Sequence, residues 1–398
     1  QRFHYFTMMR SLFFKHVAQT SPEPMALEIS HADGNYLFGT NGKPYLDLIA
    51  GISVSNVGHR NLDVLNAIKN QADQHLHTLV YGEHIQHPQV LLALALAKTL
   101  PQPLSQICFV NSGSEAIEGA MKLVKRVTGR FEILGCKNAY HGSSQGALSL
   151  NGDEYYKRNF RPLLPGIRQI RFGNLEDLNR INEKTAGVFI ETVQGEAGVR
   201  KAETTYFKRL RQKCSDTGTM LVLDEIQTGF GRTGSFWGFT QYDIVPDAIV
   251  MAKGMGGGMP IGAFAASVQH LSQFTFDPVL GHISTFGGHP VSCAASLATM
   301  KFMENHQLIG QVKEKESLFL ERLVHSSIIE TRSAGLLMAV ELGSFDKVLQ
   351  TIRYCLEMGV ITDWFLHCNT ALRIAPPLTI RPEEIKSACE VIVSALNK

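Results

Sequence analysis

Short runs of nearly continuous apolar residues recur between about residue 50 and residue 290. They are "QICFV" (106–110), "FEILGC" (131–136), "GVFIE" (187–191), "MLVLDE" (220–225), "AIVMA" (248–252) and "IGAFAAS" (261–267). Runs without polar alternation are typical of strands buried on both faces. Amphipathic segments at 115–129 and 203–218 lie between them, and each ends in glycine, as helices often do. The pattern predicts an α/β fold with a mostly parallel central sheet and helices on both faces.

The pattern changes after residue 290. The stretches "LLMAVEL" (336–342) and "ALRIAPPLTI" (371–380), with a helix expected after Pro382, indicate a smaller α+β domain. We expect the first fifty residues to pack with it. The predicted division is therefore an N-terminal segment at 1–50, a large domain at 51–290 and a C-terminal small domain at 291–398.

The bulk composition excludes several classes of protein. A net charge of +2 over 398 residues gives no reason to expect a nucleic-acid or anionic-membrane partner. The seven cysteines are scattered without a CxxC pair, which favours free thiols in a reducing, cytoplasmic compartment over disulfides or a metal site. The basic, aromatic N-terminus lacks the long apolar region of a signal peptide, and no apolar run is long enough to span a bilayer.

Lys253 follows the apolar run at 248–252 and precedes a crowd of glycines. A lysine at the end of a buried strand is costly to desolvate, and glycines remove side chains where something else must come close. Asp224 and Glu225 end another apolar run, where carboxylates need partners. One interpretation is a buried aspartate that stays ionised against a protonated ring nitrogen. The other is a pair of acids that caps the next turn.

Ser112, Gly113 and Ser114 open a helix directly after a strand. Free backbone N–H groups and the helix dipole make such a position an anion site. An ordinary capping box between Ser112 and Glu115 explains the same residues. The lysine of an ATP-binding P-loop is missing.

Parallel strands bring Lys253, Asp224 and the serine loop to one edge of the sheet, where ligands of such folds bind. A lysine nucleophile, a carboxylate and a phosphate cradle are what a pyridoxal phosphate enzyme needs. We expect the glycines after Lys253 to leave room for that cofactor.

The stretches "LVLDEIQTGFGRTGSFW" (221–237) and "PDAIVMAKGMGGGMPIGAF" (246–264) resemble the signature of class III, fold type I, pyridoxal phosphate-dependent aminotransferases. The acetylornithine and ornithine aminotransferases are the nearest branch. The resemblance extends from "YLDLIAGISVSNVGHRN" (45–61) to "LRIAPPLT" (372–379). It implies a fold type I enzyme that works as a homodimer, with active sites at the subunit interface.

The resemblance also assigns roles to residues. It implies Lys253 as the lysine that carries the cofactor and Asp224 as the partner of the ring nitrogen. The other cofactor-binding positions that it implies are Ser112, Gly113, Ser114, Tyr140, His141, Gln227 and Thr285. Tyr140 would stack on the ring, Gln227 would lie near the phenolic oxygen, and Thr285 would reach the neighbouring subunit's phosphate site. Read without the resemblance, Tyr140 is an ordinary interior tyrosine.

Glu196 and Arg373 match the family's substrate-binding pair. Arg373 would bind an α-carboxylate, and Glu196 would neutralise it when the donor lacks one there. The alternative is two surface charges. The pair favours transamination, by a ping-pong mechanism, from an ornithine-like or other ω-amino donor to 2-oxoglutarate.

Two departures from the family's pattern bear on the substrate. Ser143 stands where the acetylornithine branch usually has a substrate-binding arginine, and Thr192 stands where proline is common. Alternatives are an ω-amino acid or amine:pyruvate transaminase, another class III enzyme such as a mutase or decarboxylase, and a catalytically inactive scaffold or nucleotide-binding protein on the same fold.

Overall fold

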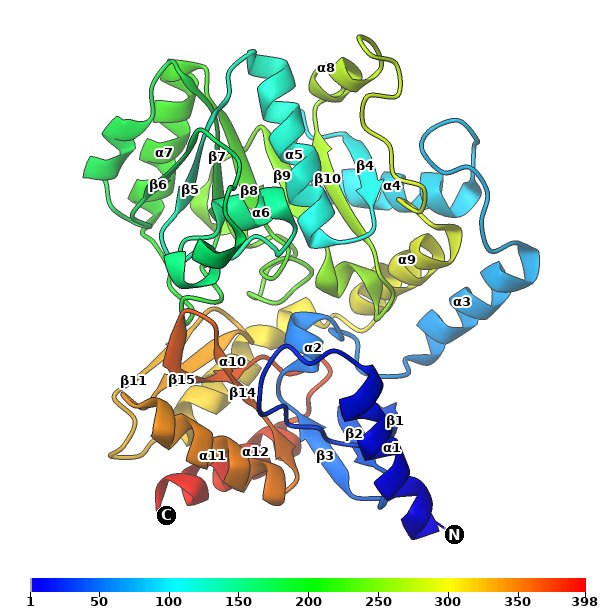
Figure 1. Cartoon of the computed structure of the whole chain (residues 1–398), viewed down its shortest axis with the longest axis vertical. Coiled ribbons are helices and arrows are strands. Elements are labelled where there is room, and N and C mark those ends of the chain that lie inside the picture. The colour runs from blue at the N-terminus through cyan, green and yellow to red at the C-terminus, as the bar shows by residue number, and fades with distance from the viewer. Residues whose placement is uncertain (1) are drawn as a thin grey trace.

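The computed structural model describes residues 2–398, so Gln1, part of the predicted N-terminal segment, lies outside the described residues. Figure 1 shows a large sheet flanked by helices above and smaller sheets below. The large sheet has the strand order β4-β10-β9-β8-β7-β5-β6. Its strands are β4 (Gln106–Val110), β5 (Glu132–Cys136), β6 (Ile167–Ile170), β7 (Thr185–Glu191), β8 (Met220–Asp224), β9 (Ala248–Met251) and β10 (Gly262–Ala266).

The pairings β6–β5, β5–β7, β7–β8 and β8–β9 are parallel, whereas β10 runs antiparallel to both β9 and β4. The predicted mostly parallel sheet is confirmed, and all six apolar runs form strands. β6 was missed, because its sequence "IRQI" is short and half polar. Since β4 and β9 point the same way across β10, their carboxyl ends still meet at one edge of the sheet.

Alternate residues of the buried strands enter two separate cores, one on each face of the sheet. Leu221 and Leu223 of β8 lie in the first core, and Met220 and Val222 lie in the second. α7 (Thr204–Thr217) covers the first face and α5 (Gly113–Thr128) covers the second. Both helices end at a glycine in the left-handed conformation, as the sequence predicts.

The chain ends meet in two smaller sheets. One has the order β1-β2-β3-β13 and the other has the order β11-β12-β15-β14. The first sheet joins the two ends of the chain, because β13 pairs in parallel with β3. The bounds are β1 (Ile29–Asp33), β2 (Tyr36–Gly39), β3 (Pro44–Asp47), β11 (Glu330–Ser333), β12 (Met338–Glu341), β13 (Val360–Ile361), β14 (Asp363–Phe365) and β15 (Cys368–Ile374). The N-terminal segment therefore contacts the C-terminal part of the chain, and the boundaries at residues 50 and 290 stay a prediction.

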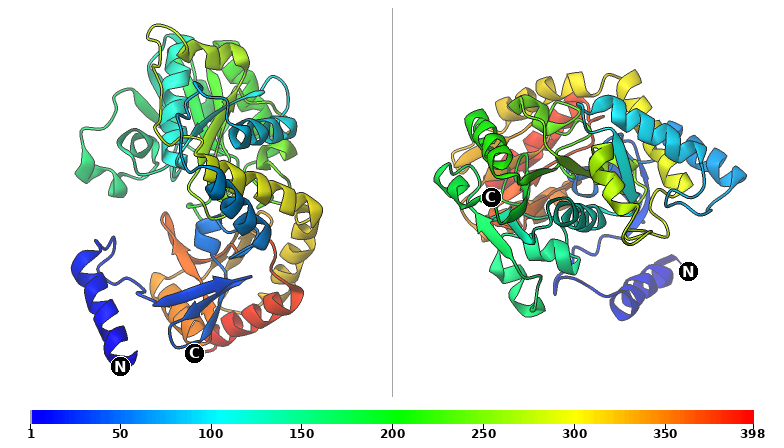
Figure 2. Two further views of the ribbon diagram at one scale, coloured as in Figure 1. Left: turned by 90° about the vertical axis from the view of Figure 1, so that its right-hand side faces the viewer. Right: turned by 90° about the horizontal axis from the view of Figure 1, so that it is seen from above.

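The remaining helices complete the layers. They are α1 (Arg2–His16), α2 (Ala50–Ser53), α3 (Leu62–Gln74), α4 (His87–Thr99), α6 (Gln145–Leu150), α8 (Val268–Leu271), α9 (Pro290–Asn305), α10 (Val312–Arg322), α11 (Phe345–Glu357) and α12 (Pro382–Leu396). Figure 2 shows α1 standing to one side of the rest of the chain. Across the described residues, every helix is too short or too polar to cross a bilayer.

One buried arginine ties the two parts of the chain together. Arg232 has no solvent exposure and donates to the backbone oxygens of Leu336 and Pro376 and to Oδ1 of Asn56. Burial lowers its pKa to about 9. These bonds fix the loop after β8 against the C-terminal segment, and that loop carries residues of the site described next.

Candidate active site

A cavity of about 440 Å³ opens at the carboxyl edge of the large sheet. It gathers residues that follow β4, β5, β8 and β9, which are far apart in the sequence. The predicted site residues that line it are Ser112, Gly113, Ser114, Tyr140, His141, Asp224, Gln227 and Lys253. Three other predicted residues, Glu196, Thr285 and Arg373, are not among its lining residues.

Ser112 is the N-cap of α5, and its Oγ accepts the N–H of Glu115 at 3.2 Å. The other half of the predicted capping box is wrong, because Glu115 turns its carboxylate to the N–H of Asn111 at 2.8 Å. The first N–H groups of a helix have no partner within it and carry the positive end of its dipole. Capping and anion binding are therefore compatible here, and the loop can hold a phosphate beside the cap.

The strand β10 approaches this loop as closely as backbone can. A Cβ on Gly262 would lie 2.3 Å from the carbonyl oxygen of Ser112, and one on Gly113 would lie 2.9 Å from Cδ1 of Ile226. The contact at Gly262 is with backbone and is too short for any side chain, whereas the contact at Gly113 is with the flexible end of Ile226. Glycine at position 262 therefore sets how closely β10 approaches the anion-binding loop.

Asp224 ends β8 and forms a buried pair with His141. Its Oδ2 lies 2.7 Å from Nδ1 of His141, and its Oδ1 accepts the N–H of Ile226 at 2.9 Å. Asn151 accepts the backbone N–H of His141 and so fixes that residue. Burial lowers the pKa of His141, but the hydrogen bond and charge of Asp224 outweigh burial and raise that pKa. The cavity thus contains an oriented carboxylate suited to a protonated ring nitrogen.

Glu225 is not among the residues that line the cavity. It is fully buried and accepts the backbone N–H groups of Gly238 and Phe239. Thr192, in the position where proline is common, donates its hydroxyl to Glu225 at 2.9 Å. Burial raises the pKa of Glu225 to about 7. Of the two acids, Asp224 faces the cavity and also accepts the N–H of Ile226 in the next turn, whereas Glu225 binds the backbone at 238–239.

Lys253 follows β9 in the cavity wall with φ +49°, a conformation that is rare for residues other than glycine and that concentrates at functional sites. Burial lowers the pKa of its amine. The charge of Glu196 opposes that shift, and the charge of Arg373 adds to it. A lysine with a lowered pKa holds more of its amine in the neutral, nucleophilic form.

The glycines after Lys253, expected to leave room for a ligand, divide into two kinds. Gly258 lines the cavity, and a Cβ there would meet nothing within 4 Å. A Cβ on Gly254 would lie 2.4 Å from Nδ2 of Asn56, and one on Gly257 would lie 2.1 Å from Oγ1 of Thr299. Gly254 and Gly257 therefore make room for neighbouring side chains, and Gly258 leaves space beside the lysine.

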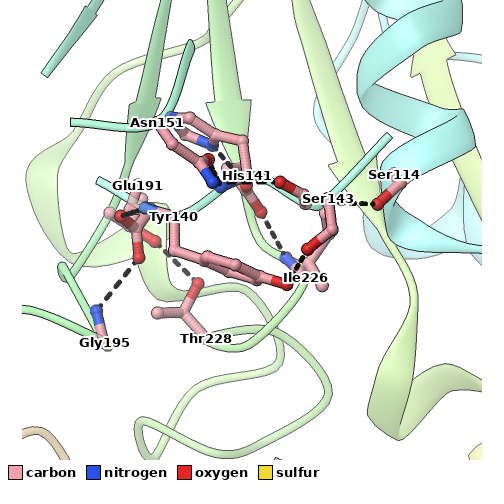
Figure 3. A network of polar contacts seen from close by, with 12 residues as sticks. Ser114, Tyr140, His141, Ser143, Asn151, Glu191, Gly195, Ile226 and Thr228 are labelled. Carbon is pink, nitrogen blue, oxygen red and sulfur yellow. Dashed lines mark hydrogen bonds and ion pairs between the residues drawn. The ribbon is translucent and has the colours of Figure 1, made fainter. Parts of the chain in front are cut away.

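Tyr140 borders the cavity between two polar groups (Figure 3). Its hydroxyl lies 3.1 Å from Oγ of Ser143, and its backbone N–H donates to Glu191. The backbone N–H of Ser143 donates to Oγ of Ser114, so the position that usually holds arginine is tied to the anion-binding loop. Among the described residues that line the cavity, Lys253 is the sole lysine or arginine.

Gln227 approaches the cavity past Gly195. A Cβ on Gly195 would lie 1.9 Å from Oε1 of Gln227, so only glycine permits this approach. Nε2 of Gln227 is buried and has no hydrogen-bond partner among the described residues. The side chain therefore has a free donor beside the cavity.

Glu191 lines the cavity and was missed by the sequence reasoning. It accepts the backbone N–H groups of Tyr140 and Gly195 at 3.2 and 3.0 Å. Burial raises the pKa of its carboxyl to about 8. The signal was available, because the run at 187–191 ends in an acid just as the run at 220–225 does.

Glu196 and Arg373 form a buried bidentate pair, with NH1–Oε1 and NH2–Oε2 distances of 2.8 Å each. Their residues are 4% and 2% exposed, so the alternative of two surface charges is wrong. Glu196 Oε2 also accepts the N–H of Leu366, and Arg373 NH2 donates to the backbone oxygen of Trp364. Both charges act on the pKa of Lys253, which places the pair near the lysine although outside the cavity wall.

Thr285 lies apart from the other predicted residues, on an exposed loop. Its neighbour Ser284 contacts the site instead, since its Oγ accepts from Nδ2 of Asn111 at 2.8 Å. Within one chain, Thr285 therefore has no part in the cavity.

Comparison with known proteins gives the class. The class-III aminotransferase family model matches residues 17–396. The acetylornithine aminotransferase of Archaeoglobus fulgidus is 35% identical over 96% of this chain and 98% of its own. The LysW-aminoadipate semialdehyde/glutamate semialdehyde transaminase of Sulfolobus acidocaldarius is 33% identical over 94% of this chain and 95% of its own. A crystal structure of ornithine aminotransferase from Toxoplasma gondii, described with partial occupancy of PLP at its active site, superposes with a TM-score of 0.89. It is 26% identical and covers 99% of this chain and 97% of that one.

The chain belongs to the class-III aminotransferases and is a pyridoxal phosphate-dependent enzyme. Its residues fit the cofactor. The N-terminus of α5 suits the phosphate, Asp224 suits the protonated ring nitrogen, and Lys253 lies between them in the same wall. The free Nε2 of Gln227 adds a donor at the cavity.

The contact between β10 and the anion-binding loop generates a prediction. Gly262→Ala should weaken pyridoxal phosphate binding about tenfold, because overpacking strain of about 1–3 kcal/mol displaces the carbonyl of Ser112. Titration of the apoenzyme, followed by cofactor absorbance, measures the affinity. Gly310→Ala is the matched control, since a Cβ there meets nothing within 4 Å. Equal affinity in both variants would contradict the role of Gly262.

Proposed function

We propose that this enzyme transfers an amino group from an ornithine-like or other ω-amino donor to 2-oxoglutarate in two half-reactions, with ping-pong kinetics. The observation that carries the proposal is the buried bidentate pair of Glu196 and Arg373. A planar guanidinium fork suits a carboxylate, and an unpaired buried cation is costly. A site that binds an α-carboxylate in one half-reaction and none in the other therefore needs a carboxylate of its own.

The charges around the pair support this exchange. Burial raises the pKa of Glu196, but the charge and hydrogen bonds of Arg373 outweigh burial and lower it. The pair is therefore ionised as it stands, which corresponds to the donor-binding state. When 2-oxoglutarate enters, its α-carboxylate takes the place of Glu196 on the NH1–NH2 edge of Arg373.

The residues of the cavity then take the following roles in the proposal. Bound pyridoxal phosphate supplies an electron sink and carries the amino group between the two substrates. Lys253 Nζ would take the proton from the substrate carbon that bears the amine and would return it once the amino group has been transferred. Asp224 would hold the proton on the ring nitrogen, with His141 orienting Asp224. Tyr140 would cover the ring face, Gln227 would donate to the phenolic oxygen, and the serine loop would anchor the phosphate.

The residues near the amino donor distinguish between the possible donor substrates. The relative from Archaeoglobus fulgidus is an acetylornithine aminotransferase, but Ser143 here offers a small hydroxyl in place of a cation. We therefore favour a small ω-amino acid over acetylornithine. An ω-amino acid or amine:pyruvate transaminase is the alternative within the family. Membership of the family identifies an enzyme, so the inactive scaffold is set aside.

We also propose that the enzyme is a cytoplasmic homodimer with Thr285 at the partner's phosphate site. The loops 75–86 and 275–289 touch through the rings of His77 and Phe286, whose centroids are 4.9 Å apart. They carry exposed apolar side chains, namely Leu76, Leu79, Ile85, Phe276, Val279, Leu280, Ile283 and Phe286. Apolar patches of this kind mark protein interfaces, and a partner would bury Thr285 with them.

Lys253→Ala should abolish transamination while leaving the fold intact, because it removes both the attachment point and the proton carrier. Borohydride should fix the cofactor to the wild-type chain and not to the variant, and mass spectrometry of the digest should place it on Lys253. Lys157→Ala, which removes another buried lysine, should behave as wild type. Substantial turnover by Lys253→Ala without added amine would contradict the assignment of Lys253 as the lysine that carries the cofactor.

The Glu196–Arg373 exchange predicts unequal damage to the half-reactions. Arg373→Ala should slow the 2-oxoglutarate half-reaction about a hundredfold more than the donor half-reaction, since a bidentate charged contact is lost in only one of them. Glu196→Ala should raise relative activity toward α-amino acids such as glutamate. Single-turnover kinetics with ornithine, acetylornithine, 4-aminobutyrate and simple amines measures both, with Glu330→Ala as control. Equal slowing of the two halves in Arg373→Ala refutes the exchange.

The dimer proposal is tested at Thr285. Wild-type protein should scatter light with twice the mass of the 44.0 kDa chain. Thr285→Ala should keep that mass and bind pyridoxal phosphate several-fold more weakly, by about the worth of one charge-assisted hydrogen bond. Thr285→Ser, which keeps the hydroxyl, should restore affinity. A monomer with full transaminase activity would contradict the dimer proposal.

A further inference from the structure

Arg373 has a second carboxylate partner that the family resemblance does not supply. β14 and β15 pair antiparallel, and their register places Asp363 directly opposite Arg373. Oδ1 of Asp363 lies 2.9 Å from Nε of Arg373. The two groups form an ion pair, although the N–H does not point along a good hydrogen-bond direction. The sheet register therefore builds Asp363 into the surroundings of the substrate-binding arginine.

The guanidinium of Arg373 is divided between two sets of contacts. Its NH1–NH2 edge faces Glu196, and its Nε faces Asp363. The guanidinium carbon lies 4.5 Å from the ring centroid of Phe365, and NH2 donates to the backbone oxygen of Trp364. The three consecutive residues of β14 thus hold the group at Nε, at NH2 and on one face. The carboxylate on the NH1–NH2 edge belongs to Glu196, which lies outside β14. It is therefore the one contact that can be exchanged without moving β14.

Asp363 also serves as a permanent counterion for Arg373. When Glu196 leaves the NH1–NH2 edge, a buried guanidinium without a counterion would be strongly unfavourable. Asp363 stays beside Nε and supplies a negative charge throughout the exchange. Its side chain is 21% exposed, so water reaches it while Arg373 stays buried. Burial raises the pKa of its carboxyl to about 6, with Arg373 opposing that shift and Glu196 adding to it.

We propose that Asp363 is a positioning residue for carboxylate recognition: it holds Nε of Arg373 so that the NH1–NH2 edge stays turned toward the carboxylate that it exchanges. The proposal rests on the proposed function, because it takes Arg373 as the site of the substrate carboxylate. Asp363 itself does not touch the substrate. Its effect is confined to ligands that use Arg373, which distinguishes positioning from a general contribution to stability.

The test compares Asp363→Ala with Asp363→Asn in the pyridoxal phosphate-loaded enzyme. Alanine removes the partner of Nε, whereas asparagine keeps an oxygen there and removes only the charge. Binding of glutarate, an unreactive dicarboxylate, is measured by calorimetry, and the KM for 2-oxoglutarate and kcat of each half-reaction are measured by single turnover. Asp247→Ala is the matched control, because Asp247 pairs with Arg211 at 2.7 Å near the opposite end of β8 and has a similar exposure of 28%.

Asp363→Ala should weaken glutarate binding and raise the KM for 2-oxoglutarate about tenfold, the worth of one contact between charged groups, with the donor half-reaction changed less than about threefold. Asp363→Asn should show a loss close to that of alanine in both, because the contact at Nε is an ion pair and asparagine removes its charge. Wild-type behaviour of the asparagine variant overturns the role of the ion pair, as does a loss that also appears in the donor half-reaction. Unchanged glutarate binding in both variants overturns it too.

Failure of the proposed function gives a different pattern. If the wild-type enzyme rejects 2-oxoglutarate but uses pyruvate, and Asp363→Ala still raises the KM for pyruvate without slowing the donor half-reaction, the acceptor is wrong and the positioning role stands. If the wild-type enzyme binds neither glutarate nor any 2-oxo acid through Arg373, so that Arg373→Ala leaves both affinities unchanged, both proposals fall.

Discussion

The meeting of β4, β8 and β9 at one edge of the large sheet is the constraint on which the site depends. Because β4 and β9 point the same way across the antiparallel β10, the anion-binding loop lies in the same cavity wall as Asp224 and Lys253. The approach is close enough to require glycine at position 262. A shift of β8 or β9 by one residue would turn the side chain at the end of that strand to the other face of the sheet. Sheet register therefore controls the chemistry.

Several charged groups are buried in this structure, and each is stabilised by different partners. Asp224 has His141, Glu225 has hydroxyl and backbone donors, and Arg373 has Glu196. Glu191 has only two backbone donors, so burial dominates and its carboxyl has a raised pKa of about 8. The raised pKa of the Glu191 carboxyl sets it apart from Glu196, whose pKa Arg373 lowers.

The two departures from the family's pattern have different consequences. Thr192 replaces a rigid residue with a hydroxyl that donates to Glu225, outside the cavity. Ser143 puts a hydroxyl that contacts Tyr140 beside the cavity, where the family usually has a cation. Under the proposed function, Ser143 therefore bears on which donor carboxylates find a partner, whereas Thr192 bears on the scaffold.

The sequence by itself determined the alternation of buried strands and helices and the strand-end positions of Lys253 and Asp224. Apolar periodicity and glycine stops are local, so they can be read in one dimension. Tertiary structure alone decided that Glu191 joins the cavity and that Glu225 is not among its lining residues, and it brought Arg373 and Glu196, 177 residues apart, into one ion pair. It also placed Asp363 opposite Arg373. Such pairings depend on register and on which way each side chain points, and both are set only when the sheets pack.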